Sequence, residues 1–261
     1  MTGSLRILLS NDDGIGARGL AVLEEVARGL SDDVWIVAPE SEQSGAGHSL
    51  TINEPLRLRQ VGERRYAVMG TPTDCVMLAV YYLMRGQRRP DLLLSGVNNG
   101  ANLGEDVTYS GTVAAALEGA LLGIRSIALS QVVRSFPGQT EPACWETAAR
   151  HGAVVIDRLL RMDDWPNGVL MNVNFPDTGP NAVTGIHATV QGRRDTGDLV
   201  IDERADTRGV PYFWIGFRMT PGAPGSDTDF AAVARDRISV TPLRVHLTDP
   251  ATLPRLRLAL S

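Results

Sequence analysis

The stretch that most constrains the fold is LRILLSNDDG, residues 5–14, in which an apolar run leads directly into two adjacent aspartates. An apolar run bounded by turn residues is typical of a strand buried in a parallel sheet. A helical pattern follows at about residues 18–30. Because ligands bind outside the carboxyl ends of strands in open α/β sheets, Asp12 and Asp13 are predicted to lie where chemistry is usually placed.

Asp12 and Asp13 can serve one site only if the chain turns after the strand, since neighbouring strand side chains point to opposite faces. Gly14 permits such a turn. Two carboxylates about 4 Å apart repel each other by roughly 4 kcal/mol at an effective dielectric constant near 20, which favours a cation or a proton between them. The alternative is structural: Asp12 caps the next helix and Asp13 is solvated.

The following chain alternates strand and helix patterns. Strands are predicted at residues 34–38, 91–95, 127–130 and 170–174, helices at about 72–86, 111–122 and 146–161, and an edge hairpin within 56–69. Met77, Leu78, Tyr81 and Tyr82 are expected in the core. This alternation indicates an α/β fold, a three-layer Rossmann-like doubly wound sheet.

The pattern changes after about residue 185. Residues 186–191, 199–202 and 212–217 are expected to form strands of a hairpin, followed by a short helix near 229–234, a strand at 238–241 and a helix after Pro250. We therefore expect a Rossmann-like core at residues 1–185. Residues 186–261 are expected to be a C-terminal extension of the same domain, with a β-hairpin that serves oligomerisation.

Composition excludes several function classes. All 25 basic residues are arginine, and the absence of lysine excludes P-loop NTPases and Schiff-base or pyridoxal chemistry. The formal net charge of −5 argues against a broad surface for a nucleic-acid polymer. The sequence contains no run of 18 apolar residues, so no membrane span is predicted. The N-terminus lacks signal-peptide features, so a cytoplasmic location is expected. Cys75 and Cys144 are expected to be buried thiols.

Two later loops add polar groups. The loop PESEQSGAGHSLT, residues 39–51, offers hydroxyls and open amides near the first site, including Ser44, Gly45 and His48; a histidine there also fits a structural role. The loop between Ser95 and Ser110 is long for a strand-to-helix connection, and such loops are usually functional or disordered. It leads into Ser110-Gly111-Thr112, where hydroxyls and amides at a helix start favour an anion site. An ordinary serine cap is the alternative.

These motifs together resemble the survival protein E (SurE) family of metal-dependent 5′-nucleotidases. The matching blocks are ILLSNDDGIGARGL, VAPESEQSGAGHSLT, GTPTDCV, SGVNNGANLGEDVTYSGTVAAALEG, YFWIGF and ISVTPL, in family order over almost the whole chain. One departure is Arg235-Asp236-Arg237, which stands where the family usually has a glycine and an aromatic residue.

The resemblance implies a metal site and a substrate. Its metal ligands would be Asp12, Asp13, Ser44 and Asn98, an all-oxygen set that suits Mg²⁺, Mn²⁺ or Ca²⁺. The family's phosphate pocket corresponds to Ser110, Gly111 and Thr112. Asn11, Gly45 and His48 complete the expected substrate contacts, and Asp12, Asp13 and Asn98 are the expected catalytic residues.

The implied activity is hydrolysis of nucleoside 5′-monophosphates by a homodimer or homotetramer, with action on polyphosphate left open. Either aspartate fits the role of general base or nucleophile. A phosphorylation-receiver domain also has an acidic pair after its first strand, but it needs a lysine and an acceptor aspartate that this chain lacks. A haloacid-dehalogenase-type phosphatase needs D-x-D. A non-catalytic nucleotide-binding module remains the alternative.

Overall fold

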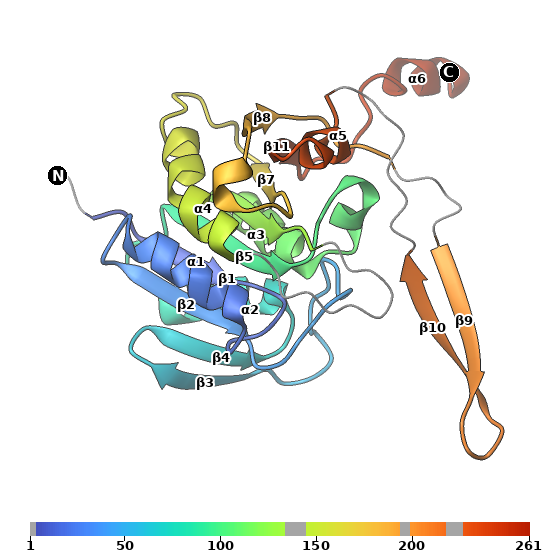
Figure 1. The fold of residues 1–261 in the computed structure, drawn as a ribbon, viewed down its shortest axis with the longest axis horizontal. Coiled ribbons are helices and arrows are strands. Elements are labelled where there is room, and N and C mark those ends of the chain that lie inside the picture. The colour runs from blue at the N-terminus through green and yellow to red at the C-terminus, as the bar shows by residue number, and fades with distance from the viewer. Residues whose placement is uncertain (1–3, 134–144, 194–198, 218–226) are drawn as a thin grey trace.

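The computed structural model describes residues 4–133, 145–193, 199–217 and 227–261. Two sheets and their surrounding helices make up this part of the chain (Figure 1). Its elements are β1 (Ile7–Ser10), α1 (Arg18–Arg28), β2 (Val34–Pro39), β3 (Arg57–Gly62), β4 (Arg65–Met69), α2 (Pro72–Leu78), the π-helical turn η1 (Ala79–Leu83), β5 (Leu92–Asn99), the 3-10 turn η2 (Gly104–Thr108), α3 (Gly111–Leu121), β6 (Arg125–Gln131), α4 (Trp145–Leu160), β7 (Val169–Phe175), the 3-10 turn η3 (Pro180–Ala182), β8 (Gly185–Ala188), β9 (Leu199–Ala205), β10 (Pro211–Phe217), α5 (Asp229–Ala234), β11 (Arg237–Arg244) and α6 (Leu253–Ala259).

The large sheet has nine strands in the order β3-β4-β2-β1-β5-β6-β7-β11-β8. The six strands from β4 to β7 in that order run parallel, with β3 antiparallel at one edge and β11 antiparallel to β7 near the other. The strand order reverses around β1: the chain goes first to β2 on one side and later to β5 on the other. The carboxyl ends of β1 and β5 therefore form the topological switch point, where ligands bind in such sheets.

Helices cover both faces of this sheet. On one face, α1 and α4 bury Leu20, Leu23 and Val155 among residues of the strands. On the other, α2 and α3 bury Val76 and Val113. This confirms the predicted three-layer α/β fold, in which the central strand β1 is wholly enclosed by apolar side chains of both layers.

The C-terminal part differs from the prediction in one respect. Residues 186–191 were grouped with the hairpin, but β8 pairs in parallel with β11 at the edge of the large sheet. The two-stranded sheet consists of β9 and β10 alone, and it stands clear of the rest of the molecule (Figure 1). The apolar pattern of the segment did not reveal this partner, because a short half-buried strand looks the same in either sheet.

The predicted helix at residues 72–86 also differs. It is α-helical over α2 and then widens into η1, which shifts the face that the next side chains present. Tyr81 and Tyr82 were expected in the core, but they are 52% and 66% exposed. Met77 and Leu78 are partly buried. Cys75 is a buried free thiol, as predicted, whereas Cys144 lies outside the described residues.

The departure at residues 235–237 has a structural counterpart. Asp236 has φ +55°, a left-handed conformation that glycine adopts without cost. Aspartate tolerates this conformation better than most residues, because its short polar side chain forms local hydrogen bonds. The turn is held by Thr184, whose amide donates to the Asp236 carbonyl at 2.8 Å, so β11 still enters the sheet.

Candidate active site

A tight turn follows β1 and brings both aspartates to the end of the sheet. Asn11 Nδ2 donates to the Gly14 carbonyl at 2.9 Å, and Gly14 has φ +101°. The Ile15 amide donates to the Pro39 carbonyl at 2.7 Å, which joins this turn to the end of β2. A side chain at position 14 would meet the backbone of Ser41 at 3.3 Å, so the glycine also allows the two loops to approach closely.

Asp12 is buried at the start of α3, at 4% exposure. The Thr112 hydroxyl donates to Asp12 Oδ1. A Cβ at Gly111 would lie 2.7 Å from the Asp12 Cβ, so only glycine lets the helix start come this near. The capping alternative is wrong, because α1 begins after Ala17 with no side-chain cap. Asp12 instead lies at the N-terminal end of α3, where the partial positive charge of the helix dipole stabilises a carboxylate.

The electrostatics of the two carboxylates follow from this enclosure. Burial raises the pKa of Asp12, while the Thr112 hydroxyl and the amides of Thr112 and Gly111 act in the opposite direction. Burial and then the neighbouring Asp12 charge raise the pKa of Asp13 to about 6, and Glu42 adds to the effect. Two carboxylates whose ionisation is costly in this way favour a bound cation.

The loops after β2 and β5 lie beside the aspartates. The Gln43 amide donates to the Asp12 carbonyl at 2.8 Å, and the Asn99 amide donates to Asp13 Oδ2 at 3.1 Å. The predicted ligands Ser44 and Asn98 are thus each the sequence neighbour of a residue bonded to the aspartate pair. Asn98 Nδ2 donates to the Gly100 carbonyl at 3.0 Å, which leaves its oxygen available, and the exposed Ser44 hydroxyl donates to Glu42 at 2.9 Å.

The predicted phosphate residues have roles within the protein itself. Ser110 caps α3, since its Oγ accepts from the Val113 amide at 3.1 Å, as the structural alternative held. Its own hydroxyl hydrogen remains able to donate. The Thr112 hydroxyl is engaged with Asp12. A bound phosphate would therefore contact Ser110 and the amides at the start of α3, while Thr112 holds Asp12. The spacing of these residues in the sequence did not predict the contact between Thr112 and Asp12.

His48 and Gly45 lie on the loop after β2. His48 Nε2 is 2.9 Å from Glu118 Oε2 on α3, with the histidine side chain 33% exposed. Gly45 is exposed, with φ +77° and open space around it. The amide of Gly47 donates to the Tyr109 carbonyl at 3.1 Å, so this loop is tied to the loop before α3. The pairing of His48 with Glu118 gives the histidine a structural contact, and a role in substrate binding stays a prediction.

The long loop after β5 is anchored by a buried polar network that sequence reasoning missed. The Asn102 amide donates to Asn174 Oδ1 at 2.9 Å and its side chain to Ser130 Oγ at 2.8 Å. Its carbonyl accepts from Asn172 and Asn174 at 2.8 and 3.0 Å. Asparagines on an otherwise apolar strand, in VLMNVNF, were the available signal. This network explains how a long loop stays fixed.

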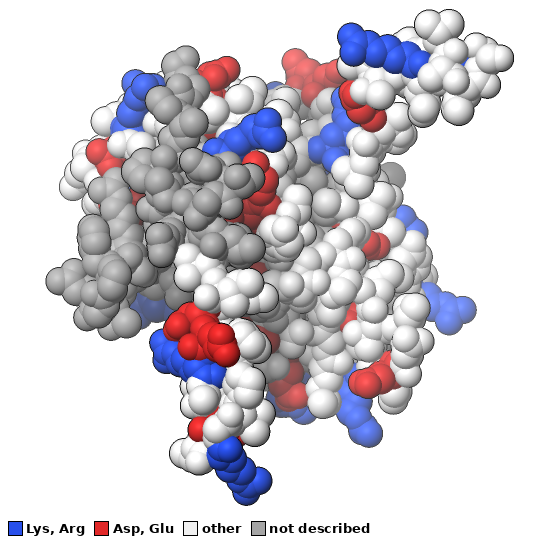
Figure 2. Space-filling model, turned by 90° about the vertical axis from the view of Figure 1, so that its right-hand side faces the viewer, with Lys and Arg blue, Asp and Glu red and all other residues white. Residues whose placement is uncertain are grey.

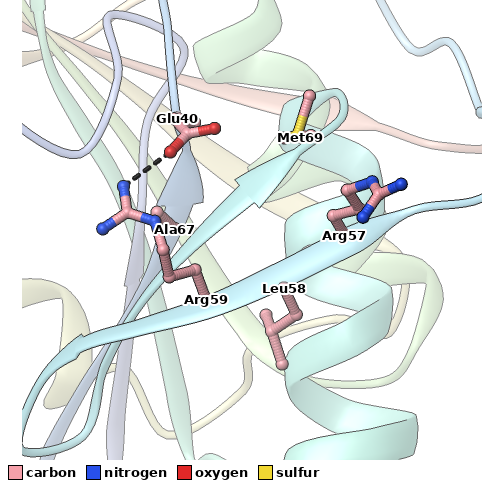
Figure 3. Close-up of a pocket in the computed structure, with 6 residues that line it drawn as sticks. All are labelled: Glu40, Arg57, Leu58, Arg59, Ala67 and Met69. Atoms are coloured by element: carbon pink, nitrogen blue, oxygen red, sulfur yellow. Dashed lines mark hydrogen bonds and ion pairs between the residues drawn. The ribbon is translucent and has the colours of Figure 1, made fainter.

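A hollow of about 420 Å³ lies at the edge hairpin, away from the aspartates, and is lined by Glu40, Arg57, Leu58, Arg59, Ala67 and Met69 (Figure 3). In it Arg59 Nη2 is 2.5 Å from Glu40 Oε1. The hollow contains none of the predicted site residues. Its side chains neutralise one another in part, so we give it no role in the site.

Within the described residues, no group of three or more histidine, cysteine, aspartate or glutamate side chains is placed to hold a metal ion. A cation at Asp12 and Asp13 would thus need neutral oxygen ligands, which Ser44 and Asn98 offer. Such a set suits hard divalent cations. The donor types and the raised pKa of Asp13 fit this kind of ion. None of the described helices is both long and apolar enough to cross a membrane.

Comparison with known proteins gives a consistent result. Residues 7–198 match the family model described as survival protein SurE. The chain is 57% identical over 256 residues to a 5′-nucleotidase SurE of Methylobacterium sp. (strain 4-46), covering 98% of this chain and 100% of the relative. It is 55% identical over 244 residues to that of Brucella anthropi, covering 94% and 93%. The crystal structure of the SurE protein from Aquifex aeolicus superposes with a TM-score of 0.84 at 37% identity, covering 98% of this chain and 100% of that one.

Proposed function

The chain belongs to the survival protein SurE family and is a 5′-nucleotidase, and we propose that it uses a divalent cation at Asp12 and Asp13 to hydrolyse nucleoside 5′-monophosphates. The observation that carries the proposal is the buried Asp12, oriented by Thr112 and the start of α3 beside a second carboxylate whose pKa is raised to about 6. Burial of two adjacent carboxylates at the switch point of the sheet makes their ionisation costly, and perturbed groups of this kind cluster at functional sites.

Each residue has a defined part in this proposal. Asp12 and Asp13 would hold the cation, with Asn98 and Ser44 as further oxygen ligands. When bound, such an ion supplies neutralisation of phosphoryl charge and ionisation of water. Ser110 and the amides at the start of α3 would bind the phosphate oxygens, so that charge developing on them meets donors already in place.

The proton chemistry falls to the carboxylates. Asp13 is only partly buried and holds one amide bond, from Asn99, so it is the better placed of the two to take a proton from water. Asp12 is fixed by its hydroxyl and helix-start contacts and serves better as a ligand. Gly45 and His48 on the loop after β2, and Asn11 in the buried turn after β1, remain the proposed substrate contacts.

The test is phosphate release from a panel of nucleoside 5′-monophosphates, in the presence of Mg²⁺, Mn²⁺ or Ca²⁺ and after treatment with a chelator. We expect release with a divalent cation and its loss on chelation, restored by adding the ion back. Release that persists at full rate after exhaustive chelation would contradict the metal requirement. Binding without release would indicate a nucleotide-binding module.

We also propose that the enzyme is a homo-oligomer, assembled through the β9–β10 hairpin. The hairpin exposes Ile201, Phe213, Trp214 and Ile215, between 57% and 71% each. Phe213, Trp214 and Ile215 are consecutive on β10, and neighbouring strand side chains point to opposite faces, so both faces of this two-stranded sheet are apolar. Such exposure is unfavourable in water unless the faces are covered. Seen from the side on which the hairpin projects, acidic and basic side chains are interspersed along it, which suits a second copy of the same chain (Figure 2). Sedimentation of the intact chain as a monomer would contradict this.

A further inference from the structure

Asp229 lies far from the aspartate pair in sequence, and neither the family motifs nor the catalytic proposal gives it a role. It is the first residue of α5 and is fully buried. Its Oδ2 accepts from the Gly104 amide at 2.8 Å, and its Oδ1 accepts from the amides of Gly192 and Phe230 at 2.9 and 2.8 Å. One carboxylate therefore joins three segments of the chain; we call it the Asp229 junction.

The first of these segments leads into the site. Gly104 begins η2, the turn that runs to Thr108 and continues through Tyr109 into the Ser110 cap of α3. The Ser110 amide itself donates to the Asp106 carbonyl at 3.0 Å within this turn. The position of Gly104 thus sets the position of the residues proposed to bind phosphate.

The other two segments are the roots of the hairpin region. Gly192 and Asp229 flank the part of the chain that contains β9 and β10. Around the junction, Gln191 Nε2 donates to the Gly104 carbonyl at 2.9 Å, and the Asp229 amide donates to the Val190 carbonyl at 3.0 Å. Both ends of the hairpin region are therefore bonded to the loop before α3.

The packing at the junction leaves little freedom. A Cβ on Gly104 would lie 2.6 Å from the Phe230 ring, and Gly104 has φ +54°. A Cβ on Gly192 would lie 2.7 Å from Asp229 Oδ1. Two glycines are thus pressed against one carboxylate and one ring, so loss of a bond at the carboxylate is expected to displace the loop rather than be absorbed locally.

We propose that Asp229 is a positioning residue, which fixes the turn Gly104–Thr108 and hence the phosphate-binding start of α3 to the roots of the hairpin region. The proposal rests on the proposed phosphohydrolase function of that site. Asp229 itself touches neither substrate nor metal.

The variant Asp229→Asn tests this with little change of shape. The side-chain oxygen of the asparagine can accept from the Gly192 and Phe230 amides only if its NH₂ group faces the Gly104 amide. Two donors then face each other, so the bond to the loop is the one that is lost. We expect the KM for adenosine monophosphate and the inhibition constant of inorganic phosphate to rise about tenfold to a hundredfold, since small misplacements at a site have effects of this size. The metal-induced shift in melting temperature should not change.

Two further variants make the result specific. Thr228→Ala removes the Thr228 side-chain cap on the Ala231 amide and keeps the Asp229 carboxylate that accepts from Gly104, so it serves as the control for reduced stability of α5. Gln191→Ala removes a bond to Gly104 from the other side and leaves the buried carboxylate in place, so it tests the loop even if Asp229→Asn folds poorly. We expect Gln191→Ala to act in the same direction, with a smaller rise in KM.

Amide hydrogen exchange tests whether Asp229 fixes the loop independently of whether the loop affects phosphate binding. In Asp229→Asn, the amides of residues 103–110 should exchange faster than in Thr228→Ala, while those of β1 and β5 stay equal. Faster exchange with kinetics equal to the Thr228→Ala control overturns the positioning role, and exchange no faster than in the control overturns the junction itself. If the wild-type enzyme released no phosphate from any nucleotide, the proposed function would fail, whereas the exchange comparison would still stand.

Discussion

The loop before α3 and the β9–β10 hairpin are both long excursions from the same sheet, yet the protein treats them in opposite ways. The loop is polar and glycine-rich. It is fixed by Asn102, which bonds to side chains on β6 and β7, by the Asn99 amide, which donates to Asp13, and by the Gly104 amide, which donates to Asp229 on α5. The hairpin is rich in aromatic and branched side chains and is bonded to itself. A catalytic loop needs fixed geometry, which polar bonds supply directionally. A surface for a partner needs exposed apolar side chains, which must not be covered by contacts within the same chain.

The largest effect is expected at the aspartate pair, beside the fixed loop. Asp12→Asn should lower phosphate release by roughly a hundredfold to ten-thousandfold, because Asp12 is a proposed ligand of the cation and a bound cation contributes several kcal/mol to the transition state. The metal-free variant should be at least as stable as the wild type, since the change removes a buried charge next to Asp13. Activity assays and thermal melts, each with and without Mn²⁺, would measure both. Activity within tenfold of wild type would remove Asp12 from the site.

The next effect concerns the residue that orients Asp12. Thr112→Val removes the hydroxyl that donates to its carboxylate, so the pKa of Asp12 should rise further and metal affinity should fall about tenfold to a hundredfold, as for other partners of metal ligands. Titration calorimetry with Mn²⁺ would measure it. The matched control is Thr108→Val, whose hydroxyl donates to the Glu105 carbonyl at 2.7 Å in the same loop without reaching Asp12.

A pH titration sharpens the same point. The pKa of Asp13 is raised from 3.8 to about 6 in the metal-free fold, so protons should compete with the metal below pH 6, at a cost of roughly tenfold in affinity per pH unit. For the metal-free protein, the stability contribution of this group is present below its unfolded pKa near 3.8 and is lost as pH rises through about 6. In Asp12→Asn the midpoint should move down, since one cause of the raised pKa is gone. A midpoint unmoved by that change would show that the Asp12 charge does not contribute to the raised pKa of Asp13.

The smallest effect on chemistry is expected at the hairpin. The double variant Trp214→Ser, Ile215→Ser removes one large apolar side chain from each face of β10 and should convert the oligomer to a monomer in sedimentation experiments. The metal-induced stabilisation of each chain should stay the same, because Asp12 and Asp13 lie in the turn after β1 and not on the hairpin. Arg204→Ala, which removes an exposed partner of Asp202 on β9, is the control and should leave assembly intact. Loss of metal binding in the double variant would contradict this separation of roles.

The sequence predicted the order of strands and helices well, because each was marked by local apolar spacing and by punctuating residues such as Gly14 and Pro72. It also placed Asp12 and Asp13 at one end of the sheet, since the carboxyl ends of parallel strands meet there. The pairing of β8 with β11 and the exposure of Tyr81 were not predicted, because both depend on which neighbour an element finds. Local pattern contains no information on that choice.

The finer structure of the site was beyond sequence for a similar reason. Gly111 is needed because the start of α3 touches Asp12. The Thr112 hydroxyl donates a hydrogen bond to the same carboxylate, a contact between residues 100 positions apart. The hydrogen bond from the Gly104 amide to Asp229 spans 125 positions. Such contacts are consequences of the whole fold, and a motif indicates only that its residues matter, not which partner each one has.

The placement of β1 at the centre of the sheet has a consequence for synthesis of the protein. Ile7 pairs with Val34 on one side but with Leu92 on the other, and Asp12 acquires its partner only when Thr112 is in place. As the chain leaves the ribosome, the two aspartates emerge before β2, the edge hairpin and α2 have been translated. Closing so long a loop is entropically slow. Competence to bind metal should therefore arise late and in one step, when α3 docks, so a nascent chain that ends before α3 would carry the whole NDDG motif without a binding site.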